Sequence, residues 1–148
     1  MKSDRGRLSA AATDAVQVFG PRLGQSFAPL VPLYLDPLIR LSGRPNKVVL
    51  KRVDKVISLL ISNCHLSSIV VELRKGLSDD AVTCRRGCAV AVVRAVNEWE
   101  KETWGEKGTR ILEECLRSAI SDKDAEVRGT GKTLWGLFTA KWPERADE

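Results

Sequence analysis

The stretch Leu73-Arg-Lys-Gly-Leu-Ser-Asp79 returns 43 residues later as Leu116-Arg-Ser-Ala-Ile-Ser-Asp122. The same offset carries Arg85 onto Arg128. Self-similarity at a fixed spacing is the sequence signature of repeat architectures, in which each unit buries its apolar face against its neighbours. The spacing therefore predicts that this chain is built from stacked repeats.

Similar short turns occur twice more, at Ser3-Asp4 and, with glycine in place of aspartate, at Ser42-Gly43. The four turns are 39, 36 and 43 residues apart. This spacing is close to the period of HEAT units, each of which is a pair of helices. An aspartate in such a turn can cap the following helix through its carboxylate.

Apolar residues recur with the period of an α-helix along most of the chain. No segment alternates with period two over a useful length, so strands are not expected. We predict an all-α, HEAT-like solenoid of about seven helices in antiparallel pairs, because a simple helical bundle needs no repeated turn. The seven apolar stripes cover residues 8–19, 27–39, 49–60, 66–77, 84–99, 111–120 and 127–138.

The order of turns sets the phase of the repeats. The turns near residues 3–6, 42–46, 78–81 and 121–125 are expected within repeats. The stretches Gly20–Ser26, Ser62–Leu66 and Lys101–Glu106 are then connections between repeats. Residues 1–148 would form one partial domain of about three and a half repeats that begins inside a repeat. Its incompletely covered N-terminal face would favour self-association.

The turns within repeats all lie along one edge of a solenoid, and this edge collects cations. A cation near a helix N-terminus is unfavourable by about 0.3–1 kcal/mol when exposed, so its repetition suggests a use. We interpret the edge as a binding surface for an acidic partner. The cations are Lys2, Arg5, Arg7, Arg44, Lys47, Arg85, Arg86, Lys123, Arg128 and Lys132.

Acidic residues share this edge and partly neutralise it. For the equivalent pair Arg85 and Arg128, a bridge between adjacent turns and a role in binding both remain open. Arg44, Lys47, Arg86 and Lys123 have no structural role in this interpretation, which makes them candidates for binding. The acids are Asp4, Asp79, Asp80, Asp122, Asp124 and Glu126. The opposite edge, near residues 99–107, mixes both signs of charge with Trp99, a core residue by its position, and Trp104, which is expected to pack over the connection.

Catalytic motifs are not convincing. Gly129-Thr-Gly-Lys-Thr133 resembles the end of a phosphate-binding loop, but Glu126 stands where that motif needs a glycine and no strand precedes it. The single histidine, His65, falls in a connection, and Asp79-Asp80 lies in an exposed turn. We therefore expect no enzyme activity and no cofactor.

The four cysteines contain no C-x-x-C pair, and a metal site is not expected. Cys84 and Cys88 share a helix face and could bind a metal together with His65. The simpler interpretation is that Cys64, Cys84, Cys88 and Cys115 fill apolar helix positions.

The balance of charge narrows the class of partner. Lysine and arginine number 24 against 19 acids, so the formal net charge is +5. This favours an acidic partner but argues against nucleic acid, because six acids share the basic edge. No apolar stretch is long enough for a membrane span, and the N-terminus lacks a secretory signal, so a cytosolic or nuclear location is expected.

The order of several short motifs resembles a known family. Residues 43–148 resemble the C-terminal half of a TOG domain of the cytoplasmic-linker-associated protein (CLASP) group. The features that carry the resemblance are His65-Leu66, Lys75-Gly76, Val82-Thr-Cys-Arg-Arg86, Asn97-Glu-Trp99 and Ile120-Ser-Asp-Lys-Asp-Ala-Glu-Val-Arg128.

The resemblance implies a non-catalytic module that binds the tubulin heterodimer or the microtubule and regulates microtubule dynamics. It also implies a cytoplasmic location on the cytoskeleton, including the mitotic spindle. The site residues that it implies are Arg44, Lys47, Arg85, Arg86, Lys123, Arg128 and Lys132. Two positions depart from the pattern, since Gly87 and Gly131 stand where the family has arginine. A generic HEAT-repeat adaptor unrelated to tubulin is the alternative.

Overall fold

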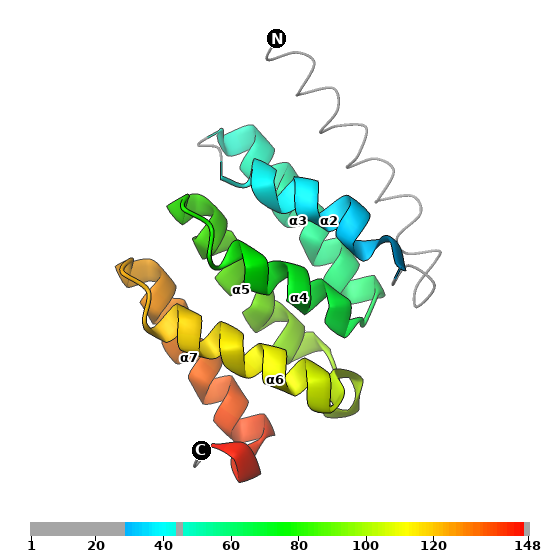
Figure 1. Ribbon diagram of the computed structural model, residues 1–148, viewed down its shortest axis with the longest axis vertical. Helices are drawn as coiled ribbons and strands as arrows, with labels where there is room; N and C mark the ends of the chain where they lie inside the picture. Colours follow the sequence, from blue (N-terminus) through cyan, green and yellow to red (C-terminus); the bar gives the residue numbers. More distant parts are fainter. Residues whose placement is uncertain (1–28, 44–45, 147–148) are drawn as a thin grey trace.

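The structure is a stack of three antiparallel helix pairs (Figure 1). It is a computed structural model that describes residues 29–43 and 46–146. Within those residues it contains helices and no strand. The helices are α2 (Val31–Leu41), α3 (Lys47–Asn63), α4 (Ser67–Gly76), α5 (Val82–Glu98), α6 (Lys101–Ile120) and α7 (Ala125–Lys141), followed by the short 3₁₀ helix η2 (Pro143–Arg145).

The pairs form two layers. The first helices α2, α4 and α6 lie side by side in one layer, and the second helices α3, α5 and α7 lie in the other (Figure 1). Helix α4 packs against α2 and α6, and α5 packs against α3 and α7. The prediction of an all-α, HEAT-like solenoid is confirmed. The first stripe, residues 8–19, and the turn at residues 3–6 lie outside the described residues, as does the connection Gly20–Ser26.

The phase of the described repeats also agrees with the prediction. The turns within pairs lie along one edge of the stack, on the left in Figure 1, and the connections between pairs lie along the other. The N-terminus of α3 is capped by Asn46, whose Oδ1 accepts hydrogen bonds from the backbone N–H of Val48 (3.0 Å) and Val49 (3.3 Å). The second helices α3, α5 and α7 all follow turns on this edge and therefore begin there.

One predicted connection is partly wrong. Residues 101–106 were expected to link two repeats, but α6 already begins at Lys101. It is interrupted at Gly105, whose φ of 61° and ψ of −175° are open to glycine and strained for other residues. The hydroxyl of Thr109 donates to the Gly105 carbonyl at 2.6 Å beyond the break. The chain thus makes its bend inside a helix.

An aromatic cluster closes the core at the connection edge. Trp99 is buried as predicted, and its Nε1 donates to the Ile61 carbonyl at 2.7 Å. Trp104 was expected to pack over the connection, but it is only 2% exposed. Its ring lies 5.1 Å from that of Trp99 and 5.9 Å from that of Trp142. Trp104 is therefore a core residue next to the bend at Gly105.

Candidate functional site

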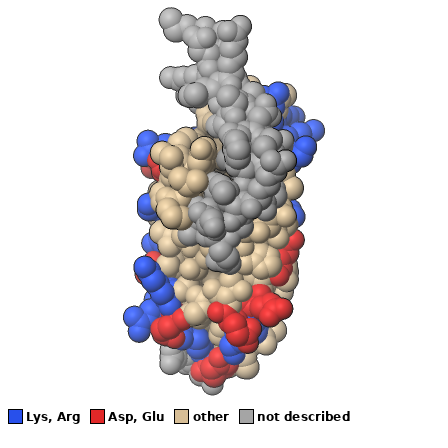
Figure 2. All heavy atoms as spheres, turned by 90° about the vertical axis from the view of Figure 1, so that its right-hand side faces the viewer, with Lys and Arg blue, Asp and Glu red and all other residues tan. Residues whose placement is uncertain are grey.

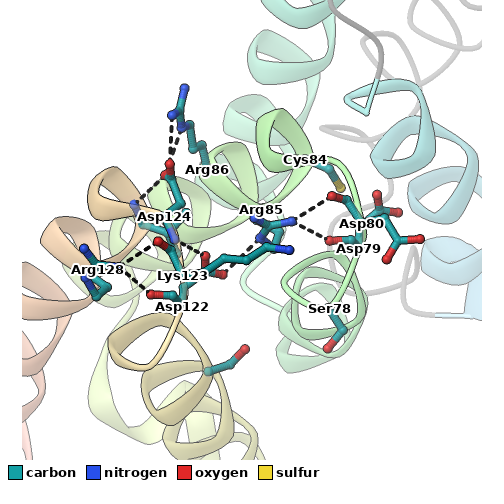
Figure 3. A network of polar contacts seen from close by, with 12 residues as sticks. Ser78, Asp79, Asp80, Cys84, Arg85, Arg86, Asp122, Lys123, Asp124 and Arg128 are labelled. Carbon is teal, nitrogen blue, oxygen red and sulfur yellow. Dashed lines mark hydrogen bonds and ion pairs between the residues drawn. The ribbon is translucent and has the colours of Figure 1, made fainter.

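The candidate site is the edge formed by the turns within repeats and by the first two turns of α3, α5 and α7. We call this surface the turn edge. Figure 3 shows its second and third turns from close by. The turn at residues 78–81 leads into α5, and the turn at residues 121–124 leads into α7. The contacts within it show which of the predicted cations are available to a partner.

Two equivalent aspartates close these turns. Asp79 Oδ1 accepts a hydrogen bond from the backbone N–H of Ala81 at 2.9 Å, and Asp122 Oδ1 accepts one from Asp124 at 2.8 Å. In both cases the donor is two residues ahead of the aspartate, which is the geometry of an Asx turn. The expectation that an aspartate of the turn caps the following helix is confirmed for α7, through Asp124 rather than Asp122, and is wrong for α5. Asp124 caps α7 by accepting from the N–H of Val127 at 3.1 Å, and α5 has no side-chain cap.

Arg85 and Arg128 make the same contacts in successive repeats. Arg85 Nη1 donates to the carbonyls of Asp79 (3.0 Å) and Asp80 (2.9 Å). Arg128 Nη1 donates to the carbonyls of Asp122 (2.9 Å) and Lys123 (2.8 Å). The 43-residue repeat in the sequence therefore corresponds to a repeated polar contact, in which an arginine on the second helix fixes the turn that precedes it.

Arg85 also joins the two turns to each other. Its Nε donates to Asp122 Oδ2 at 3.0 Å, between side chains that are 8% and 7% exposed (Figure 3). These contacts engage Nε and Nη1, and the low exposure of the side chain leaves the remaining donors little access to a partner. Of the two alternatives for Arg85, these contacts favour the bridge between turns.

Arg86 has a structural role that the sequence interpretation denied. Its Nε and Nη2 donate to Asp124 Oδ2 (3.0 Å) and Oδ1 (2.9 Å), and its Nε lies 2.9 Å from Glu126 Oε2. The hydrogen bond from Arg86 lowers the pKa of Asp124 to about 2. The prediction that Arg86 has no structural role is wrong, because the stacking of α5 on α7 brings it to the N-terminus of α7. Its side chain nevertheless remains 41% exposed.

Three lysines on the turn edge remain available. Lys47, Lys123 and Lys132 are exposed, and none forms an ion pair within the described residues. Arg128 is exposed as well, although its Nη1 is engaged. Arg44 lies outside the described residues, as do Lys2, Arg5 and Arg7. The structure thus places Lys123 and Arg128 at the start of α7, Lys132 one turn beyond Arg128 on the same helix, and Lys47 at the start of α3.

The acids of the edge are largely engaged. Asp122 and Asp124 hold Arg85 and Arg86, and Glu126 lies against Arg86. Asp79 accepts from its own turn, and Asp80 is exposed. Because the buried and half-buried arginines neutralise most of these carboxylates, the charges that face outward at the start of α7 are mainly those of the exposed lysines and Arg128.

The opposite edge has a different character. Figure 2 shows this side, with charges of both signs gathered at the end formed by the last helix pair. Lys101 Nζ lies 2.8 Å from Glu144 Oε1, and Arg145 contacts Glu106 at 3.0 Å and Glu113 at 2.5 Å. These pairs tie η2 to α6. The connection edge therefore carries charges of both signs, as the sequence predicted.

The phosphate-loop resemblance is not supported by the fold. Residues 129–133 lie inside α7, with no strand before them in the described chain. A Cβ at Gly131 would stand 3.0 Å from the backbone of Ala119 and Ile120, so this glycine allows α7 to approach α6 closely. Gly129 faces open space. Packing therefore does not explain the presence of Gly129.

The cysteines are buried, and the hydrogen bond with Cys88 lowers the pKa of the Cys84 thiol to about 7. All four are free and buried, as predicted. Burial raises the pKa of Cys115 to about 12, which keeps its thiol protonated. His65 lies in the connection between α3 and α4, with its ring 6.0 Å from that of Trp99. Among the described residues no group of three or more ligating side chains could hold a metal.

Sequence reasoning missed a basic stripe along α3. Lys47, Lys51 and Lys55 are spaced four residues apart, are exposed, and form no ion pair within residues 29–43 and 46–146. Their position opposite the apolar stripe of the same helix was visible in the sequence.

None of the described helices combines the length and the apolar character that a bilayer-spanning helix requires.

Comparison with known proteins gives consistent matches. The sequence profile of a family described as "CLASP N terminal" matches residues 1–148. Protein STU1 of Coccidioides immitis (strain RS) is 25% identical over 148 residues, which cover 97% of this chain and 12% of that protein. Protein STU1 of Mycosarcoma maydis is 22% identical over 154 residues, which cover 99% of this chain and 12% of that protein. The CLIP-associated protein of Arabidopsis thaliana is 22% identical over 101 residues, which cover 67% of this chain and 7% of that protein. The chain therefore spans about an eighth of the length of either fungal relative.

Proposed function

The chain belongs to the CLASP N-terminal family, and from this premise we propose that it is a non-catalytic module that binds tubulin through its turn edge. The partner is the tubulin heterodimer or the microtubule, and the role is regulation of microtubule dynamics in the cytoplasm, including at the spindle. Residues 1–148 act as one partial TOG-like domain of about three and a half repeats. Self-association through its N-terminal face concerns residues outside the described part and stays a prediction.

One observation carries this proposal. The cations that the turn edge exposes are concentrated where the second helices begin, and Lys47, Lys123 and Lys132 have no carboxylate partner in the described residues. Tubulin is acidic, so its surface would compensate these charges. The N-termini of α3, α5 and α7 add partial positive charge at the same edge.

The individual residues take different parts in the proposed surface. Lys47, Lys123, Arg128 and Lys132 contact the partner directly, and Arg44 is assigned to the same group from its position in the sequence. Arg86 contributes its exposed portion while it holds Asp124. Arg85 sets the distance between two turns and lies too deep for direct contact.

The proposal is tested by sedimentation of the chain with microtubules and by size-exclusion chromatography with free tubulin, each at low and at physiological salt. We expect binding to at least one form of tubulin, with an affinity that falls as salt rises because exposed charges are screened. Absence of binding to both forms at low salt would contradict the proposal. Binding that is insensitive to salt would contradict the assignment of the site.

A further inference from the structure

An exposed tryptophan stands on α7, the last α-helix of the described stack. The chain has four tryptophans, and three of them belong to the core, since Trp99, Trp104 and Trp142 are 1%, 2% and 3% exposed. Trp135, in contrast, is 42% exposed. Its ring stacks on that of Phe138, with the centroids 6.1 Å apart and an angle of 21° between the planes. The indole is therefore presented to solvent on a buried aromatic support.

The 43-residue repeat identifies the side of α7 that carries this tryptophan. A shift of 43 residues carries Arg128, Lys132, Trp135 and Thr139 onto Arg85, Ala89, Val92 and Val96 of α5. These residues of α5 are all buried, and Arg85 is bonded to Asp122 in the turn that leads into α7. They therefore lie on the side of α5 that the next helix pair covers. The corresponding side of α6 and α7 is the outer end of the described stack, at the lower end of Figure 1, and we call it the end face.

The end face differs from a surface that another helix pair would cover. Lys132 stands at the position of the buried Ala89, and a lysine is almost never fully buried unless it is paired. On α6, Glu113 stands at the position of the fully buried Val70 and is bound by Arg145 of η2. A polar outer face is typical of the terminal repeats of solenoids. These two charged residues therefore make the end face unsuited to a further helix pair stacked in the same way.

Trp135 departs from this polar character. Its counterpart in α5, Val92, is smaller and fully buried. Ile120 of α6 is 42% exposed, and its backbone N would lie 3.0 Å from a Cβ at Gly131, one turn before the tryptophan. Tryptophan is enriched at the centres of protein–protein interfaces, where a few such residues supply most of the binding energy. An exposed tryptophan on a largely polar face therefore indicates an anchor for a protein partner.

Cations flank the indole on the same helix. Lys132 precedes Trp135 by three residues and Arg128 precedes it by seven, so the helical spacing places all three on one face of α7. Both cations are exposed, and neither forms an ion pair in the described part of the chain. They also belong to the turn edge, and Trp135 lies about 10 Å farther along α7 than Arg128. The tryptophan thus continues the turn edge onto the end face, beside charges that favour an acidic partner.

We propose that Trp135 is an apolar anchor of the partner-binding surface, which extends from the turn edge along α7 onto the end face. The partner supplies an apolar contact for the indole and carboxylates for Arg128 and Lys132. The inference rests on the proposed tubulin-binding function for the identity of the partner. It adds that binding depends on the burial of one aromatic side chain as well as on charge.

Hydroxyl-radical footprinting of the wild-type chain, read by mass spectrometry, measures the exposure of Trp135 with and without tubulin. We expect its oxidation to fall at least about fivefold in the complex, because an anchor is desolvated there. Leu33, which is 66% exposed on α2 at the other end of the described stack, should be oxidised as before. Unchanged oxidation of Trp135 in a chain that binds tubulin would overturn the proposal. Protection that appears without tubulin as the chain concentration rises would identify a second copy as the occupant and would also overturn it.

A matched pair of variants removes an exposed apolar side chain without changing charge. Trp135→Ala removes the anchor, and Leu33→Ala is the control. We expect the first variant to bind tubulin about tenfold more weakly than wild type and the second to bind as wild type. The ratio between wild type and Trp135→Ala should persist as salt rises, because screening weakens charge interactions and not the apolar contact. Circular dichroism melting checks that both variants fold, and the footprint of the wild-type chain depends on neither.

The outcomes separate the two proposals. Absence of tubulin binding by the wild-type chain would contradict the proposed function and the anchor together. Tubulin binding by wild type that is unchanged in Trp135→Ala, or weakened equally in Leu33→Ala, would overturn the anchor alone and leave the proposed function standing.

Discussion

Arg85 and Asp122 form a bridge between two successive repeats, with the Nε of the arginine 3.0 Å from Oδ2 of the aspartate. Each of the two side chains also forms hydrogen bonds with the backbone of a turn. Arg85 holds two carbonyls of the preceding turn, and Asp122 closes the following turn through its other oxygen. The bridge therefore fixes the separation of two neighbouring turns, and with it the spacing of the cations that the turn edge presents.

We expect Arg85→Ala to lower the free energy of unfolding by about 3 kcal/mol, because removal of one partner leaves a buried carboxylate without its cation. Arg128→Ala is the matched control, since Arg128 makes the same two contacts to carbonyls but no ion pair in the described residues. It should cost about 1 kcal/mol. Urea unfolding of both variants measures the difference. Equal losses would mean that the bridge adds nothing to stability.

The pairing of Arg86 with Asp124 predicts sensitivity to acid. The pKa of Asp124 is lowered from 3.8 to about 2, mainly by the hydrogen bond from Arg86. Because the folded-state pKa is below the ordinary value, this carboxylate stabilises the folded chain above about pH 4, and the stabilisation disappears as the pH falls toward 2.

Asp124→Asn removes this charge but keeps a side chain that can cap α7. We expect the variant to be less stable than wild type near pH 6 and to match it near pH 2, as measured by urea unfolding at both pH values. Asp80→Asn, at an exposed position of the same edge that forms no ion pair in the described residues, should be as stable as wild type near pH 6. A stability difference that is independent of pH would contradict the role given to the ion pair.

The glycines of α7 should respond in opposite directions to substitution by alanine. Gly131→Ala places a Cβ 3.0 Å from the backbone of α6 and should cost about 1–3 kcal/mol, because two helices have to move apart. Gly129→Ala meets no atom and should stabilise the helix by up to about 1 kcal/mol. Thermal unfolding of the two variants measures both effects. A neutral Gly131→Ala would show that the contact between α6 and α7 is looser than described.

The repeat register could be predicted from the sequence because it depends only on the spacing of similar turns and on the apolar period of each helix. The turns, the equivalence of Arg85 and Arg128 and the alternation of the two helix layers all follow from a spacing and an apolar period. The burial of Trp99 follows from the same period, since it continues the stripe of α5.

The remaining features depend on how neighbouring pairs stack. The contact of Arg86 with Asp124 joins residues 38 apart and needs the lateral position of α5 on α7. The positive φ of Gly105 and the burial of Trp104 beside it are not revealed by a helical pattern. A groove lined by Leu50, Val53 and Gly87 requires α3 and α5 to lie side by side, which a helical pattern does not reveal.

The most direct test compares two triple charge reversals for binding to tubulin at low salt. Lys47→Glu, Lys123→Glu and Lys132→Glu change the turn edge. Arg94→Glu, Lys107→Glu and Arg110→Glu change exposed cations elsewhere and alter the net charge by the same amount.

The dissociation constant for the tubulin heterodimer is the quantity measured. We predict that the turn-edge variant binds at least about tenfold more weakly than wild type, while the control variant stays within about threefold. Equal weakening in both variants, or wild-type affinity in the turn-edge variant, would contradict the assignment of the turn edge as the tubulin-binding surface.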